Sequence, residues 1–411
     1  MTTKILPAKK QLDFLDWEFG VFFHFGIRTY YEGHMDWDGQ DMPAEAFMPD
    51  ELDCEQWISA VKACGAKYAI LTTKHHDGFA NWPSAYTEYS VKNTPWKAGK
   101  GDVVREFTDA CRKCGVRVGL YYSPAQKDFE SMSGQEYDDY FVNQITELLS
   151  NYGKIDYLWF DGCGSENHEY DRDRIIGVIR GLQPEIAIFS MWDPDTRWVG
   201  NEEGIVPLGC RYVVESAKTS IREQEAQWLA EPKFLPYECD CKIRHKNWFY
   251  SENDEYLLRS LEDLMGLYYY SVGRGGNLLL NIAPDRRGLL PDADCARLRE
   301  FAEERDRRFA NPIDCKIEKN GDIYTIILDK SRLVDHVVIE EDLAEGQNIF
   351  GFRISMDYFG YMPLLEGKTI GHKQICQFPA VYGDKFALEI LDYTGEYKLK
   401  SVKLYYTSKD C

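Results

Sequence analysis

The chain has no long hydrophobic run. Nowhere in its 411 residues do about 18 consecutive apolar residues occur, the length that a membrane-spanning helix needs. The first twenty residues, MTTKILPAKKQLDFLDWEFG, also lack the unbroken apolar stretch of a signal peptide. The sequence therefore predicts a protein that does not enter a membrane, is not exported and works in the cytoplasm.

Positive charge is scarce. There are 48 Lys and Arg residues against 68 Asp and Glu residues, which gives a formal net charge of −20. Nucleic acids and anionic membranes bind basic surfaces, so neither is an expected partner. The composition gives no indication of the oligomeric state.

Several motifs of cofactor and metal chemistry are absent. The chain has no HExxH, no GxxxxGK[ST] loop, no serine in a nucleophile elbow and no GxGxxG after its first predicted strand. Cys111-x-x-Cys114 has no second pair at zinc spacing, and its helix-like setting favours core packing. In a reducing cytosol the twelve cysteines are expected as free thiols. We therefore expect no cofactor and no metal.

What the chain does have is a recurring unit, an amphipathic stretch followed by a glycine and a β-rich run. It occurs at residues 53–73, 101–123 and 136–160, with Gly65, Gly115 and Gly153 where a left-handed residue would end each helix. Helices that alternate with strands buried on both faces predict a parallel sheet.

Eight apolar runs fit such strands. They are FGVFFHFG (19–26), YAILTTKHH (68–76), RVGLYYS (117–123), YLWFD (157–161), IAIFSM (186–191), RYVVES (211–216), FLPYEC (234–239) and NLLLNIAP (277–284). Eight strands predict a (β/α)8 TIM-like barrel over residues 1–313. The short alternating runs of residues 314–411 predict a C-terminal antiparallel β-sandwich.

Polar residues follow the predicted barrel strands, where barrel enzymes carry their active sites. They are His24, His75 with His76, Tyr121, Asp161, Trp192, Glu215 and Glu238. Asp161 stands out because it ends the apolar run of IDYLWFDGCG, and Gly162 and Gly164 are expected to let the chain turn there without crowding a ligand. Because successive strand side chains point to opposite faces, His75 and His76 are not expected to share one ion.

Carboxylates among histidines and aromatic rings are typical of glycoside hydrolysis. That reaction uses one carboxylate as nucleophile or base and another as acid, with aromatic faces against the sugar ring. On position alone, Asp161 could instead cap the end of its strand or pair with Arg172 or Arg174. The residue pattern by itself leaves both interpretations open.

Five motifs, FGVFFHFG, KYAILTTKHHDGFANWPS, YLWFDG, RWVGNEEG and SVGRGGNLLLNIAP, resemble those of the α-L-fucosidases of glycoside hydrolase family 29. The resemblance extends from about Phe19 to Gly288. It implies a retaining exo-hydrolase that removes terminal α-L-fucose from fucosylated oligosaccharides, without a metal or cofactor. The alternatives are a retaining hydrolase of a related α-L-sugar, such as an α-L-galactoside, and a non-catalytic fucose-binding protein.

The resemblance also assigns residues. It implies that Asp161 is the nucleophile. The residues implied to bind the substrate are His24, Trp37, His75, His76, Tyr121, Trp159, Arg197 and Trp248.

The acid/base is less directly assigned. Glu202, in RWVGNEEG, resembles the acid/base of the subfamily that cleaves α-1,3/1,4 linkages, and Glu238 is its competitor. The segments AQKDFESMSGQEYDDY and LGCRYVV depart from that subfamily, which affects the expected linkage preference more than fucose recognition.

Overall fold

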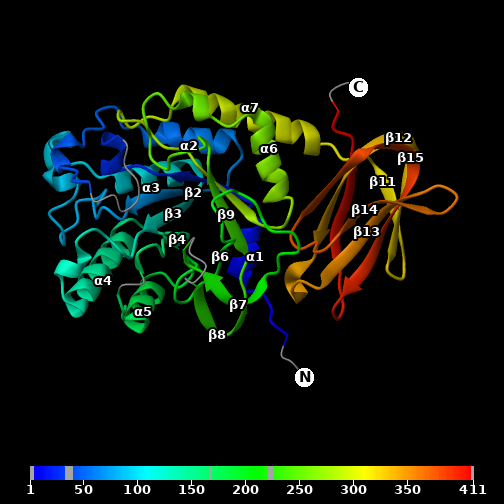
Figure 1. Ribbon diagram of the computed structural model, residues 1–411, viewed down its shortest axis with the longest axis horizontal. Coiled ribbons are helices and arrows are strands. Elements are labelled where there is room, and N and C mark those ends of the chain that lie inside the picture. The colour runs from blue at the N-terminus through cyan, green and yellow to red at the C-terminus, as the bar shows by residue number, and fades with distance from the viewer. Residues whose placement is uncertain (1–3, 33–39, 166–167, 221–225, 409–411) are drawn as a thin grey trace.

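The computed structural model describes residues 4–32, 40–165, 168–220 and 226–408. An N-terminal α/β part and a C-terminal β part lie side by side (Figure 1).

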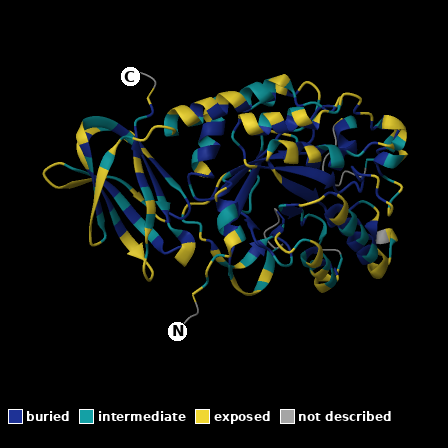
Figure 2. Ribbon diagram, turned by 180° about the vertical axis from the view of Figure 1, so that it is seen from behind, coloured by how far each residue is buried: buried dark blue, intermediate teal, exposed yellow. Residues whose placement is uncertain are grey.

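Eight parallel strands form the central sheet of the N-terminal part. Their order is β5-β4-β3-β2-β1-β10-β9-β6. The strands are β1 (Phe19–Phe23), β2 (Tyr68–Lys74), β3 (Arg117–Tyr122), β4 (Tyr157–Phe160), β5 (Ala187–Phe189), β6 (Arg197–Trp198), β9 (Tyr237–Lys242) and β10 (Asn277–Asn281). The Ser190 N–H donates to the Thr196 carbonyl at 3.0 Å, which links the end of β5 to the start of β6. The sheet therefore closes nearly into the predicted barrel, and its strands are almost wholly buried (Figure 2).

Two of the expected strands are placed differently. RYVVES contributes to β7 (Val213–Lys218), which pairs with β8 (Ala226–Phe234) in an antiparallel hairpin outside the barrel sheet. Val213 and Glu215 are exposed, whereas barrel strands are buried on both faces. The sixth barrel strand is instead β6. The next strand, β9, begins at Tyr237 rather than at residue 234, directly after Pro236, which has no N–H for a ladder.

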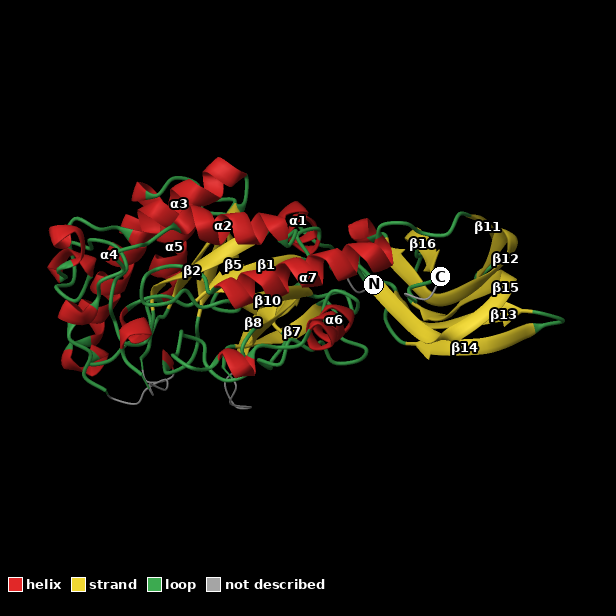
Figure 3. Ribbon diagram, turned by 90° about the horizontal axis from the view of Figure 1, so that it is seen from above, coloured by secondary structure: helices red, strands yellow, loops and turns green. Residues whose placement is uncertain are grey.

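Helices lie around the barrel sheet (Figure 3). They are α1 (Lys9–Leu15), α2 (Cys54–Ala63), α3 (Val103–Cys114), α4 (Gly134–Asn151), α5 (Arg172–Leu182), α6 (Leu261–Tyr270) and α7 (Asp292–Phe309). The first of them, α1, packs Phe14 against the inward-facing rings of Tyr68 and Tyr157. The recurring unit is confirmed in α2, α3 and α4. In α3, for example, Asp102 accepts the Arg105 N–H at 2.8 Å, and Gly115 ends the helix with φ +69°.

Among the described residues, no helix combines the length and the apolar character needed to cross a bilayer. Cys111 lies fully buried in the barrel core, which agrees with its predicted packing role. Cys54 and Cys239 are likewise buried free thiols.

The C-terminal part is antiparallel, as predicted. Its strands are β11 (Cys315–Asn320), β12 (Ile323–Glu341), β13 (Ile349–Asp357), β14 (Tyr361–Gly367), β15 (Gln374–Tyr393) and β16 (Leu399–Tyr405). The long strands β12 and β15 shift register between Ile327 and Arg332 and again between Val334 and His336. Such irregularities bend a sheet. The bent strands enclose a core that includes Ile326, Phe352 and Phe386.

Candidate active site

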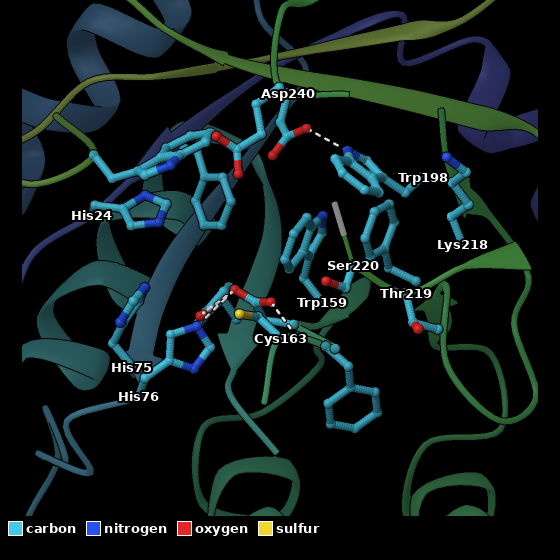
Figure 4. A pocket seen from close by; sticks show the side chains of 18 residues that line it. His24, His75, His76, Trp159, Cys163, Trp198, Lys218, Thr219, Ser220 and Asp240 are labelled. Atoms are coloured by element: carbon cyan, nitrogen blue, oxygen red, sulfur yellow. Dashed lines mark hydrogen bonds and ion pairs between the residues drawn. The ribbon is translucent and has the colours of Figure 1, made fainter. Parts of the chain in front are cut away.

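A cavity opens at the carboxyl ends of the barrel strands. Including the space open to solvent, it encloses about 660 Å³. The predicted residues that line it are His24, His75, His76, Tyr121, Trp159, Asp161, Glu202 and Trp248. Figure 4 shows histidines along one wall and Asp240, Trp198 and Lys218 along the other.

Asp161 follows β4 and lies in the cavity with its carboxylate held on both oxygens. Tyr121 Oη donates to Oδ2 at 2.8 Å, and the Cys163 N–H donates to Oδ1 at 3.0 Å. His76 Nε2 lies 3.4 Å from Oδ2. Burial opposes ionisation, but the charge and hydrogen bond of His76 and the other two donors hold the pKa of Asp161 below its usual value. The carboxylate is therefore ionised and oriented.

Both adjacent histidines line the cavity, which differs from the alternation expected of a strand. β2 ends at Lys74, and its pairing with β3 shifts register between Thr72 and Lys74, so His75 and His76 lie beyond the regular pleat. Their donor atoms and a carboxylate oxygen of Asp161 lie within 4.8 Å of one another, a spacing that would also suit one metal ion. Asp161 Oδ2 already contacts Tyr121 and His76.

His76 is fixed by its other ring nitrogen. Ser123 Oγ donates to the Ala125 carbonyl, so at 2.6 Å it accepts a hydrogen bond from the Nδ1–H of His76. The ring is thereby oriented with Nε2 toward Asp161. His75 stacks on the Tyr121 ring, with centroids 5.4 Å apart and planes 7° from parallel. The pair thus forms an ordered wall.

His24 is a neutral imidazole. Burial lowers its pKa to about 3. Asn281 Nδ2 donates to the Trp248 carbonyl, so the amide presents Oδ1 to His24 Nδ1 at 2.7 Å. Nδ1 is then the protonated nitrogen, and Nε2 is left as an acceptor, a group suited to a hydroxyl.

Stacked aromatic rings form the floor of the cavity. Trp159 stacks on Phe189, with centroids 4.2 Å apart, and on Tyr121 at 5.4 Å. Trp159 Nε1 donates to Glu238 at 2.9 Å. Glu238 is completely buried, also accepts from Tyr68, and is absent from the cavity lining. The structure thus places this competitor for the acid role beneath the floor, where burial raises its pKa to about 7.

Glu202 lies in the cavity wall. It is carried by the loop that follows β6, and its Oε2 pairs with Lys242 Nζ at 3.2 Å. Lys242 Nζ in turn lies 4.5 Å from the ring centroid of Trp248. Asp161 and Glu202 are therefore two carboxylates in one pocket.

One predicted substrate contact, Arg197, is not brought into the cavity. Arg197 lies on β6 with its guanidinium turned away, where it donates to the Arg211 carbonyl at 3.0 Å and lies over the Tyr237 ring. Its neighbour Trp198 lines the cavity instead, because adjacent strand residues face opposite sides. Trp37 lies outside the described residues.

Asp240 and the hairpin residues Lys218, Thr219 and Ser220 also line the cavity and were not predicted from the sequence. The sequence did contain an indication that Asp240 faces the cavity. It is two positions from Glu238 in PYECDCKI, so both belong on the inner face of one strand, and Asp240 lies nearer its carboxyl end. No sequence pattern indicated that the hairpin residues line the cavity, because their approach to it depends on the tertiary structure.

Carboxylates, oriented histidines and an aromatic floor at the carboxyl ends of a barrel are the site of a glycoside hydrolase. A family model described as alpha-L-fucosidase matches residues 4–303. The chain belongs to the α-L-fucosidase family, and its activity is that of an α-L-fucosidase.

Individual relatives of the chain are named as α-L-fucosidases as well. Alpha-L-fucosidase 1 of Arabidopsis thaliana is 32% identical, over 91% of this chain and 82% of the relative. The plasma alpha-L-fucosidase of Homo sapiens is 27% identical, over 69% of this chain and 65% of the relative.

Solved structures share the whole fold. A glycoside hydrolase 29 family member from an unknown rumen bacterium has a TM-score of 0.90 at 32% identity, over 99% of this chain and 78% of that one. A Ruminococcus gnavus GH29 fucosidase in complex with fucose has a TM-score of 0.84 at 25% identity, over 99% and 96% of the two chains.

Proposed function

We propose that the protein is a retaining exo-α-L-fucosidase that removes terminal fucose, α-1,3/1,4-linked, from fucosylated oligosaccharides, with Asp161 as nucleophile and Glu202 as acid/base. The observation that carries the assignment is the Asp161 carboxylate, kept ionised in the cavity by three donors. A nucleophile must be deprotonated and aimed at the reacting carbon, and this geometry provides both.

The reaction is a double displacement. Asp161 forms a bond to the anomeric carbon while the bond to the leaving oxygen breaks, and that oxygen takes a proton from Glu202. Water then attacks the anomeric carbon and gives a proton to Glu202, and the ester to Asp161 breaks. Fucose leaves with its original configuration.

The surrounding groups support recognition of a sugar. His24 offers an acceptor, His75 and His76 form a polar wall, and Trp159 with Phe189 offers a flat apolar surface. The contacts of His24, His75, His76, Tyr121, Trp159 and Trp248 with fucose are part of the proposal. The linkage preference is supported by the RWVGNEEG segment, and hydrolysis of α-1,2, α-1,3, α-1,4 and α-1,6 fucosides tests it directly.

We also propose a domain boundary between residues 313 and 314. It falls between the end of α7 at Phe309 and the start of β11 at Cys315. The cytoplasmic location stays a prediction.

The nucleophile is tested with Asp161→Gly. Hydrolysis should be abolished, and added azide should yield a fucosyl azide of inverted configuration, because a small anion can occupy the space of the lost carboxylate. A fluorinated fucosyl fluoride should label the peptide that contains Asp161 in the unmodified protein. Labelling of another residue would refute the assignment.

The acid/base is tested with Glu202→Ala. Removal of a general acid costs about 10²–10⁴-fold on substrates with poor leaving groups and little on activated aryl fucosides. Azide should restore turnover with a product of retained configuration. If Glu238→Ala shows this behaviour and Glu202→Ala does not, the assignment is wrong.

A further inference from the structure

The inner face of β9 carries a row of ionisable side chains. Glu238, Asp240 and Lys242 are spaced by two residues and point to the same side, while Cys239 and Cys241 are buried on the other. Glu238 lies beneath the floor, Asp240 lines the cavity, and Lys242 bonds to Glu202. The row therefore leads from the barrel interior to the proposed acid/base.

Backbone hydrogen bonds fix Glu202 beside this row. The Val199 N–H donates to the Glu238 carbonyl at 2.9 Å, and the Gly204 N–H donates to the Asp240 carbonyl at 3.2 Å. Gly204 has φ +69°, and a side chain there would meet Cys241 Sγ at 2.8 Å. The loop is thus held along β9 on both sides of Glu202.

Asp240 is a buried carboxyl group with one hydrogen-bond donor on its side chain. Its Oδ1 accepts from Trp198 Nε1 at 2.7 Å, the hydrogen bond drawn in Figure 4, and the residue is 5% exposed. Burial raises its pKa well above the usual value, and the negative charges of Glu202 and then Glu238 add to the effect.

Other charged groups complete the surroundings of the two carboxyls. Lys242 faces Glu202 from β9, and Lys218 lines the same cavity from β7. His24 is neutral, and Asp161, which follows β4, lines the same cavity. Lys242 alone would favour an ionised Glu202, which cannot act as an acid. Asp240 is a second carboxyl in the same cavity wall, and the Gly204 N–H to Asp240 carbonyl hydrogen bond holds the Glu202 loop along its strand. This carboxyl opposes the loss of the last proton, because the wall would then carry two like charges.

We propose that Asp240 and Glu202 hold one proton between them, and that Asp240 is the positioning residue that keeps this proton available for the leaving oxygen. The inference rests on the proposed assignment of Glu202. In the first step the shared proton passes to the leaving oxygen as its bond to the anomeric carbon breaks and Asp161 bonds to that carbon. In the second step the attacking water returns one proton to the pair as the ester to Asp161 breaks.

The test is the pH dependence of kcat/KM for Asp240→Asn with a fucosyl oligosaccharide. Asparagine keeps an oxygen for Trp198 but cannot ionise. We expect the alkaline limb to move to lower pH by about one unit or more, the coupling typical of interacting carboxyls. An activated aryl fucoside should show little change in kcat. An unmoved alkaline limb would overturn the proposal.

Lys242→Met should shift the alkaline limb of kcat/KM in the opposite direction. Without the cation, the doubly ionised pair is less favourable, so the alkaline limb should move to higher pH. A shift of both variants in the same direction would also overturn the proposal. Binding of free fucose, measured by calorimetry, identifies any variant whose pocket has collapsed.

Glu203→Gln is the matched control. Glu203 is the exposed neighbour of Glu202. Glu203→Gln removes a negative charge that solvent screens, so the alkaline limb of kcat/KM should shift little. Two results separate this inference from the proposed function. If Glu202→Ala shows no dependence on the leaving group, the proposed function fails. If Asp240→Asn, rather than Glu202→Ala, gives azide products of retained configuration, Asp240 is itself the acid/base and the shared-proton role is refuted.

Discussion

At the scale of single residues, the state of Asp161 depends on its donors. A buried carboxyl would ordinarily be harder to ionise, and only Tyr121, His76 and the Cys163 N–H reverse that tendency. Each donor therefore affects both the pKa of Asp161 and the direction in which its oxygens point. Tyr121 is the most accessible to experiment, because removal of one hydroxyl leaves its stacking on Trp159 in place.

Tyr121→Phe should shift the acidic limb of kcat/KM to higher pH. Loss of a donor to the ionised form raises the pKa of Asp161, so a higher pH is needed to deprotonate the nucleophile. A hydrogen bond to a charged group contributes about 1.5–3 kcal/mol, so the limb should move by about one to two pH units and activity on its acid side should fall by about 10-fold to 100-fold. A pH profile with an aryl fucoside measures both effects.

Tyr122→Phe is the matched control for this variant. The Tyr122 hydroxyl donates to Gln144 at 2.8 Å, is buried and lies outside the cavity. The control should lose stability without a shift of the acidic limb. Equal shifts in the two variants would show that Tyr121 acts through general packing rather than through Asp161.

The sequence predicted most of these residues, because His24 and Asp161 directly follow apolar strands and Tyr121 lies near the end of one. The interpretation of Glu238 depended on where its strand ended. With β9 ending at Lys242 rather than at residue 239, Glu238 lies below the floor and Asp240 at the wall. A shift of about three residues in a strand boundary thus changes which carboxylate meets the ligand.

At the scale of elements, prediction from sequence succeeded where a strand was long enough to show a pattern. β2 is buried along all seven residues, and its apolar run was recognisable. β6 has only two residues, so no pattern could reveal it, and the apolar start of β7 resembled the missing strand. The bulge that brings His75 and His76 to one side was equally hidden, because register shifts depend on the neighbouring strand.

The β7–β8 hairpin packs directly on the chain beyond Asp161. A Cβ atom at Gly162 would lie 2.1 Å from the Thr219 carbonyl oxygen, so this glycine is required by the hairpin rather than by the space for a ligand. Gly162→Ala should displace either the hairpin or Asp161. A displacement of this kind can cost about 10²-fold in kcat/KM.

Gly177→Ala is the control for that substitution. Gly177 lies within α5 with no atom near its Cβ position, so alanine should stabilise the protein by about 0.5–1 kcal/mol and leave turnover unchanged. Full activity in Gly162→Ala would show that the hairpin can move away without consequence for the site.

At the scale of the whole molecule, the barrel and the C-terminal sheet are joined by backbone and side-chain contacts. The Ile313 N–H donates to the Leu404 carbonyl at 2.8 Å, and the Ile375 N–H donates to the Gly273 carbonyl at 2.9 Å. Glu18, which precedes β1, contacts His372 and Lys373. The sequence patterns that predicted the two parts could not identify Glu18 as the connecting residue.

Glu18→Gln should weaken this junction in a pH-dependent way. Burial opposes ionisation, but His372 and Lys373 lower the pKa of Glu18 from 4.5 to about 2. Because the folded-state pKa is depressed, the stabilisation is complete above about pH 4.5 and is lost as the pH falls toward 2. The side chain is only 26% exposed, so the free energy of unfolding should fall by about 2–3 kcal/mol at pH 7, with a smaller loss near pH 3.

Denaturant unfolding at several pH values measures the effect, and Glu345→Gln supplies the comparison. Glu345 pairs with Lys4 at 3.0 Å between the N-terminal segment and the sandwich, but it is 71% exposed. Exposed pairs contribute about 0–1 kcal/mol, so this variant should differ little from the unmodified protein. Equal losses in the two variants would mean that the stability of the junction comes from its net charge. A larger, acid-sensitive loss in Glu18→Gln would instead establish one buried ion cluster as the connection between the two parts.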